Sequence, residues 1–171
     1  MLAVSINPFD TPTVAWRDVE EDSEYVEYLL PHFREPSSAL VAFDSWVGNK
    51  DRKNPGNLIF TEEESGEVNS AYIDFANSLF FGTADSNPDV IEPVGAYPDA
   101  SQLDVQVLES TIEAIERLPS SKIKEIVSRV PEDFLSETQK LKIVSGLLRR
   151  RSTLKSSLAR FFGELQWTGT A

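Results

Sequence analysis

Three oxygen-bearing side chains, Asp51, Asn57 and Asp74, have the types and the order that a magnesium site requires. Magnesium prefers hard oxygen ligands and usually takes one or two carboxylates. In one class of phosphotransfer enzymes, one Asp orients the acceptor hydroxyl and takes its proton, while an Asn several residues later and a second Asp hold the metal. The sequence therefore predicts a phosphotransfer site with Asp51 as the base and with Asn57 and Asp74 as metal ligands.

A buried helix is predicted just before the loop that carries the first of these residues. Apolar residues recur nearly all round the segment 36–47, and Gly48 is a good stop signal. An acidic, amphipathic helix over 18–33 precedes it and is expected to end at Pro31, which places His32 in a solvated loop. A lone histidine also excludes a His-rich metal site.

A β-hairpin is predicted to follow the loop. Short apolar runs at 58–60 and 71–73 predict its strands, and the glutamate-rich turn 62–67 predicts an exposed tip. Two of the predicted site residues precede the first strand and the third follows the second strand. All three can therefore meet at one end of the hairpin.

Helices are predicted for most of the remainder. Residues 82–100 have the Gly and Pro content of a loop. Helical spacing follows at 103–118, with Ser101 as the expected cap, then at 123–127 and from Ser136 onward. We expect one α+β domain, mainly α, whose small antiparallel hairpin carries the site. This single domain would span 1–171. It would comprise an extended lead-in (1–17), a catalytic-loop and metal-turn region (18–100) and C-terminal helices (101–171).

Charge is distributed unevenly along the chain, whose net charge is −12. Residues 1–119 hold 23 acidic and 6 basic side chains, whereas residues 120–171 hold 5 and 10. This balance argues against general nucleic-acid binding, which needs clustered Lys and Arg. The expected arrangement is an acidic face beside a basic helical tail. Residues 149–151 could grip phosphate or the acidic face of a partner, but are interpreted as cations that a helix C-terminus favours.

The sequence also lacks the marks of several protein classes. It has no cysteine, which excludes disulfides and thiolate metal sites. No run approaches the ~18 consecutive apolar residues of a membrane span, and the N-terminal segment lacks the basic region of a signal peptide. We therefore expect a cytoplasmic protein with no membrane partner.

The predicted loop resembles a known catalytic loop. The segment FDSWVGNKDRKNPGNLIF (43–60) is similar to the W-x-G-N-x-D-R-x-x-x-N loop of HipA-like kinases and, more distantly, to that of phosphatidylinositol kinases. AYIDFANSLFF (71–81) resembles the metal-binding turn of the HipA-like family. IVSRVPEDFL (126–135) and IVSGLLRRRSTL (143–154) resemble its C-terminal helices, so the likeness covers roughly residues 36–155.

The resemblance implies the C-terminal lobe of a kinase-like fold. Such a lobe uses Mg²⁺ and ATP to phosphorylate a hydroxyl, by family analogy a Ser or Thr of a protein. Asp51 would be catalytic, and Asn57 and Asp74 would bind the metal and its ATP. Asn57 comes one residue later than the D-x-x-x-x-N pattern requires, which leaves Asn54 as a substitute. Ala76 replaces the Gly of the turn and reduces its backbone freedom.

The ATP-clamping lobe of a kinase is expected to be missing. Such a lobe holds ATP with a Gly-rich loop and a strand Lys that pairs with a Glu. Residues 1–42 contain no glycine, and Lys50 is the only lysine before Asp51. We therefore expect the chain to be a fragment, to receive this lobe from a partner chain, or to be non-catalytic.

Other interpretations stay open. A non-catalytic or split-kinase interaction module would be favoured by an exposed apolar patch near Trp46, Phe60 or Phe75. A magnesium-dependent phosphodiesterase or phosphatase would use Asp44 as a third carboxylate beside the two predicted aspartates. Arg52 would either neutralise carboxylates of the loop or lie in solvent. Asp and Asn also occur simply as turn formers.

Overall fold

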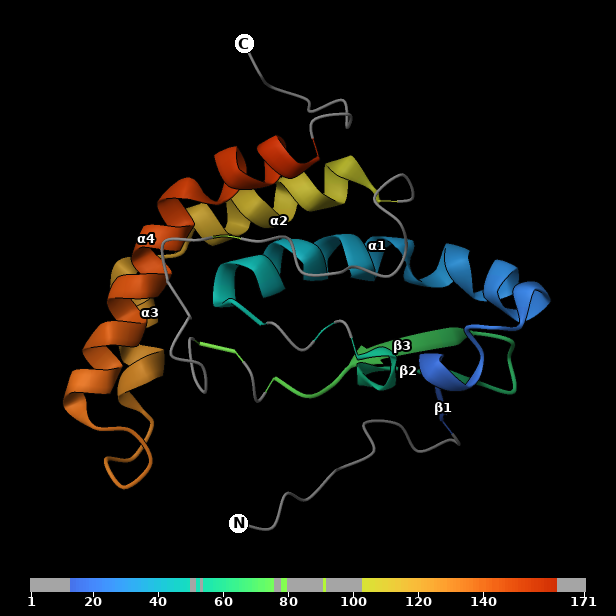
Figure 1. Ribbon diagram of the computed structural model, residues 1–171, viewed down its shortest axis with the longest axis horizontal. Coiled ribbons are helices and arrows are strands. Elements are labelled where there is room, and N and C mark those ends of the chain that lie inside the picture. The colour runs from blue at the N-terminus through green and yellow to red at the C-terminus, as the bar shows by residue number, and fades with distance from the viewer. Residues whose placement is uncertain are drawn as a thin grey trace.

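The computed structural model describes residues 13–49, 52, 54–75, 78–79, 91 and 103–162. Within them the chain is α+β and mainly helical, which confirms the predicted class (Figure 1). The elements, in chain order, are β1 (Val14–Ala15), the 3₁₀ turn η1 (Trp16–Asp18), α1 (Ser23–Val47), the 3₁₀ turn η3 (Pro55–Asn57), β2 (Leu58–Glu62), β3 (Val68–Tyr72), α2 (Val105–Arg117), α3 (Ser120–Ser128) and α4 (Glu137–Phe161).

Helix α1 runs unbroken through Pro31 and Pro36, so the predicted division into two helices is wrong. Each interior proline removes one helical hydrogen bond and costs about 3 kcal/mol. Burial on both sides of the prolines offsets this cost, through Leu29, Phe33, Val41, Ala42, Trp46 and Val47. His32 is exposed as predicted, but it lies on a helix rather than in a loop.

The C-terminal end of α1 lies at the predicted Gly48, whose φ of 69° places it in the left-handed conformation that glycine adopts without strain. The last four carbonyls of a helix have no helical donor. The carbonyl of Asp44 accepts from the backbone N–H of Gly48. The carbonyl of Val47 accepts from Leu79 over 2.8 Å, which ties the segment after the hairpin to this helix end.

Arg150 of α4 supplies donors for two other carbonyls at the end of α1. Its Nε donates to Trp46 over 2.8 Å, and its Nη2 donates to Ser45. In return, the indole N–H of Trp46 donates to the carbonyl of Leu147 over 2.9 Å. Helices α1 and α4 are therefore joined by polar bonds in both directions.

The arginine triplet 149–151 lies well inside α4 rather than near its C-terminus, so that part of its interpretation is wrong. Two of these arginines do bind helix C-termini, but the termini belong to α1 and α2. Arg150 binds the end of α1, and Arg151 donates to the carbonyl of Leu118, the residue that follows α2. Arg150 and Arg151 thereby stabilise the packing of α4 on its neighbours.

The sheet has three antiparallel strands in the order β1-β2-β3. The predicted hairpin is confirmed as β2 and β3, with Leu58 opposite Tyr72. Part of the predicted lead-in is a strand, because Val14 pairs with Phe60 and makes β2 the central strand. Residues 1–12 lie outside the described part.

Two hydrophobic cores lie on opposite sides of α1. We call the first the sheet core; it is formed by Trp16, Leu29, Phe33, Leu58 and Phe60. The second, the helical core, packs the C-terminal half of α1 against α2, α3 and α4. Figure 1 shows the sheet beneath α1, with α2 and α4 above it. One helix therefore carries both cores.

The starts of two C-terminal helices are fixed by side-chain caps. Asp104 caps α2 by accepting from two backbone N–H groups, whereas the predicted cap Ser101 lies outside the described residues. Ser136 and Gln139 form a capping box at the start of α4, and the helix begins where the sequence predicted. Of the predicted loop 82–100, only Ile91 is described.

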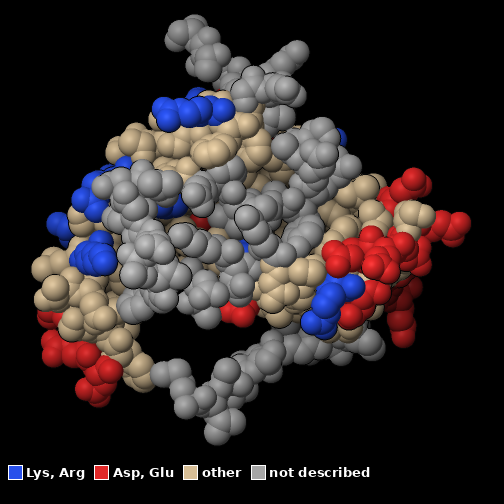
Figure 2. Space-filling model, in the orientation of Figure 1, with Lys and Arg blue, Asp and Glu red and all other residues tan. Residues whose placement is uncertain are grey.

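The two charge regions are visible on the surface. Figure 2 shows acidic side chains gathered where Figure 1 places the start of α1 and the hairpin, and basic side chains together with a smaller acidic group near α3 and α4. Tyr28 of α1 donates to Glu62 over 3.2 Å within the acidic region. Across the part of the chain that the structure describes, no helix is long and apolar enough to span a membrane.

Candidate functional site

The base of the β2–β3 hairpin brings two of the predicted site residues together. Leu58 lies opposite Tyr72, and one step further the backbone N–H of Ile73 donates to the carbonyl of Asn57 over 3.0 Å. Asp74 is the next residue along the chain. Asn57 and Asp74 therefore leave the same end of the hairpin, as the sequence predicted.

Asp74 has an unusual backbone conformation. Its φ of 57° lies in the left-handed region, which non-glycine residues rarely adopt and which Asp and Asn tolerate best. Conformations of this kind cost about 1–3 kcal/mol and concentrate at functional sites. Asp74 is exposed whereas Asn57 is buried, so the hairpin base offers an exposed carboxylate beside a buried amide.

Two other residues of the predicted site, Asp51 and Ala76, lie outside the described residues, and the catalytic role of Asp51 stays a prediction. Asn54, the substitute ligand, shapes the loop. Its side-chain oxygen accepts from the backbone N–H of Gly56 over 3.0 Å and caps η3. The side-chain oxygen of Asn54 is therefore engaged within the loop.

Arg52 is buried, so the interpretation that places it in solvent is wrong. Its Nε donates to a carboxylate oxygen of Asp44 over 2.6 Å, and the two side chains are 2% and 1% exposed. Its Nη1 donates to the carbonyls of Asn57, over 3.0 Å, and Ile73, over 2.9 Å. Arg52 therefore connects α1 to both sides of the hairpin base.

Asp44 places a carboxylate on the buried face of α1. One of its oxygens accepts from Arg52, and the other accepts from the side-chain amide of Asn49 over 3.2 Å. Burial raises the pKa of Asp44, and the guanidinium of Arg52 and the Asn49 amide oppose that rise. Asp44 is 1% exposed and both of its oxygens accept protein donors, which argues against its use as the third carboxylate of a phosphodiesterase.

The pairing of Asp44 with Arg52 was not predicted from the sequence, although the sequence contains a signal for it. A charged residue at a buried helical position needs a partner, because an unpaired buried charge is very unfavourable. The apolar pattern of 36–47 marks Asp44 as such a position. The pattern does not identify which residue is the partner, because no helical or strand repeat relates Asp44 to Arg52.

Aromatic rings enclose the guanidinium of Arg52. Its central carbon lies 4.8 Å from the ring centre of Phe75 and 5.5 Å from that of Tyr72. The hydroxyl groups of Tyr72 and Ser37 are hydrogen-bonded, which links β3 to α1. Burial raises the pKa of Tyr72 to about 12, so this hydroxyl keeps its proton at neutral pH.

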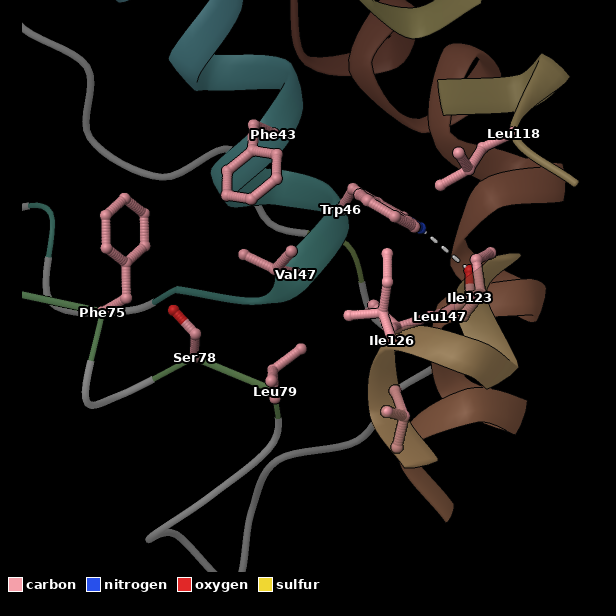
Figure 3. A pocket seen from close by; sticks show the side chains of 11 residues that line it. Phe43, Trp46, Val47, Phe75, Ser78, Leu79, Leu118, Ile123, Ile126 and Leu147 are labelled. Carbon is pink, nitrogen blue, oxygen red and sulfur yellow. Dashed lines mark hydrogen bonds between the residues drawn. The ribbon is translucent and has the colours of Figure 1, made fainter. Parts of the chain in front are cut away.

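Apolar hollows flank the aromatic residues next to the hairpin base. One has a volume of about 510 Å³ and lies between the end of α1, the segment after the hairpin and α3 (Figure 3). The other, of about 470 Å³, lies between α1 and β3. Phe43 and Phe75 line both hollows and meet edge to face, with their ring centres 6.0 Å apart.

The donors at the hairpin base fit magnesium in type. Asn57 offers an amide oxygen and Asp74 a carboxylate, both hard ligands. Among the described residues, no three His, Cys, Asp or Glu side chains gather closely enough to hold a metal ion. The predicted set contains only two carboxylates, and Asp51 is not described, so bound Mg²⁺ and ATP stay predictions.

No protein-family model, curated protein or solved structure matches this chain. The likeness to HipA-like kinases therefore depends on the sequence motifs alone.

Proposed function

We propose that the chain is the catalytic lobe of a HipA-like, magnesium- and ATP-dependent phosphotransferase. The acceptor would be a hydroxyl group, Ser or Thr of a protein by family analogy. Asp51 would orient this hydroxyl and accept its proton, and Asn57 and Asp74 would hold magnesium. Magnesium, when bound, would neutralise charge on the phosphates.

The backbone geometry at the hairpin base is the observation that supports this proposal most. The bond from Ile73 to Asn57 places the two proposed ligands at one end of the hairpin. Asp74 adopts a left-handed conformation there, and such strain persists only where the surrounding structure enforces it. Arg52, the chain neighbour of the proposed base, binds both sides of the same end.

The substitution Asp74→Asn tests the proposal. Asn tolerates the left-handed backbone as well as Asp does, so the change removes the charge with little effect on the turn. We expect the chain, assembled with an ATP-clamping lobe, to lose Mg-ATP binding in calorimetry. Asp133→Asn, an exposed change between α3 and α4, is the control. Unchanged Mg-ATP affinity of Asp74→Asn would reject the assignment.

Exposed aromatic residues favour a second function, that of a non-catalytic or split-kinase interaction module. Trp46 and Phe60 are buried, but Phe43 is 39% and Phe75 41% exposed, with an apolar hollow on each side. Exposed apolar clusters of this kind mark interaction surfaces.

An apolar fluorescent probe such as anilinonaphthalene sulfonate can test whether this surface is open. Under the interaction-module hypothesis, the probe binds the folded chain, and the double change Phe43→Ser/Phe75→Ser removes most of the signal. Phe134→Ser, at an exposed phenylalanine before α4, is the control. An unchanged signal in the double variant would contradict an open surface at this position.

A further inference from the structure

Arg52 lies where it can fix the separation of Asn57 and Asp74. Its Nη1 carries two N–H groups, and the bonds from this nitrogen go to the carbonyls of Asn57, over 3.0 Å, and Ile73, over 2.9 Å. Moving either side of the hairpin base lengthens one of these bonds. We propose that Arg52 is a positioning residue that holds the two proposed metal ligands in place; this inference rests on the proposed function.

Arg52 contacts the chain on both sides of Asp74. It binds the carbonyl of Ile73, which precedes Asp74, and its guanidinium carbon lies 4.8 Å from the ring centre of Phe75, which follows it. These two contacts bracket the residue whose backbone is left-handed. They give a physical reason why Asp74 keeps this conformation.

The other edge of the guanidinium is anchored in helix α1. Asp44 accepts from Nε over 2.6 Å, in surroundings where both side chains are almost fully buried. Hydrogen bonds between ionised groups are short and strong, and more so away from water. The C-terminal end of α1 is in turn joined to α4 through Arg150. Arg52 therefore positions the hairpin base relative to the helical core.

Stability alone does not explain an arginine at this position. A buried ion pair can often be replaced by well-packed apolar residues without loss of stability. The planar fork of Arg serves a carboxylate at one edge and carbonyls at another, which a Lys cannot do. Metal ligands must be held within about 0.5 Å of their working positions, and this requirement accounts for the arginine.

A double variant separates positioning from stability. Asp44→Leu/Arg52→Met removes both charges together, so neither partner is left buried and unpaired. Arg52→Lys keeps the charge but loses the fork. Glu113→Gln/Arg117→Gln, which removes an exposed ion pair of α2, is the control. Each full-length chain is titrated with Mn²⁺ by electron paramagnetic resonance, and exchange of the Ile73 amide is followed by NMR.

We expect the folded double variant to bind Mn²⁺ at least ~10-fold more weakly than the wild type, the usual scale of an outer-shell effect on metal affinity. Arg52→Lys should also bind more weakly, and the control should not change. The amide of Ile73 should exchange faster in both Arg52 variants, because its acceptor on Asn57 is held less firmly.

Two results would overturn the inference in distinguishable ways. If the variants bind Mn²⁺ as tightly as the wild type, Arg52 does not position the ligands, while the proposed function stands. If the wild type itself binds no Mn²⁺ at the hairpin base, the proposed function fails. In that case, hydrogen exchange of the Ile73 amide still tests the role of Arg52. Faster exchange in the variants supports a positioning role, and unchanged exchange rejects it.

Discussion

Two buried arginines, one from α4 and one from the loop after α1, make different contacts with the end of helix α1. Arg150 comes from the helical core and donates to the backbone carbonyls of Ser45 and Trp46. Arg52 comes from the loop and donates to the side chain of Asp44, then extends its other bonds to the hairpin base.

The two sets of contacts differ in what they serve: those of Arg150 satisfy a helix end, whereas those of Arg52 hold the candidate site. Every helix end needs donors for its last carbonyls and favours a cation there. The bonds from Arg150 to the end of α1 therefore follow from the fold. Those of Arg52 go further, because they fix two carbonyls beside a strained and exposed Asp74. The fold alone does not require a buried charge to hold an exposed turn. This contrast favours the hairpin base as the functional site.

Arg52→Met should have the largest effect on stability. The change leaves Asp44 as an unpaired buried charge, which costs about 3–5 kcal/mol of unfolding free energy. Burial raises the pKa of Asp44 above its unfolded value, and losing the guanidinium raises that pKa further. Stability of the variant therefore falls as pH rises from the unfolded pKa, about 4, through the folded pKa. Urea unfolding near neutral pH and near pH 4 measures the difference.

The double variant Asp44→Leu/Arg52→Met is the matched control, because it removes the charge that Arg52→Met leaves unpaired. We expect it to regain most of the lost stability and to lose the added pH dependence. A loss in Arg52→Met that is equal at both pH values would show that the ionised carboxylate of Asp44 is not its cause.

Arg150→Met should have the next largest effect, a loss of about 3 kcal/mol, because the carbonyls of Ser45 and Trp46 lose charged donors in a buried region. Hydrogen exchange measured by mass spectrometry should speed up in the last turn of α1 and in α4. Arg149→Met, at an exposed neighbouring position of α4, should change little. Faster exchange confined to the hairpin would contradict the division between the two arginines.

Tyr72→Phe should have the smallest effect, and mainly at high pH. Burial raises the pKa of Tyr72 to about 12, whereas an unfolded Tyr titrates near 10. The unfolded chain therefore loses this proton first, so stability falls as pH rises from about 10 to about 12, by roughly 2 kcal/mol. Tyr72→Phe should remove this decline in urea unfolding, and Tyr25→Phe should keep it. An equal decline in both variants would contradict the assignment.

Local signals in the sequence predicted much of the fold. The apolar runs and the glutamate turn located the hairpin, and Gly48 and Ser136 marked a helix end and a helix start. The prediction that α1 is divided into two helices at the prolines is wrong, because burial in two cores outweighs the local cost of Pro31 and Pro36. That balance depends on tertiary packing, which periodicity does not describe.

The candidate site was predictable in part. Types and order of residues predicted that Asn57 and Asp74 share one end of the hairpin, since strand register carries them there. The pairing of Asp44 with Arg52 was not predictable, because a loop, rather than a helical or strand repeat, sets their approach. The left-handed backbone of Asp74 also comes from its surroundings, since Asp only tolerates that conformation.

NMR mapping of bound Mn²⁺ on the full chain is the sharpest test of a metal site at the hairpin base. We expect paramagnetic broadening to be strongest at the amides of Asn57 and residues 73–75, and we expect Asp74→Asn to remove it. Broadening centred on the acidic hairpin tip at 62–67, or on the start of α1, and unchanged in Asp74→Asn, would contradict a metal site at the hairpin base.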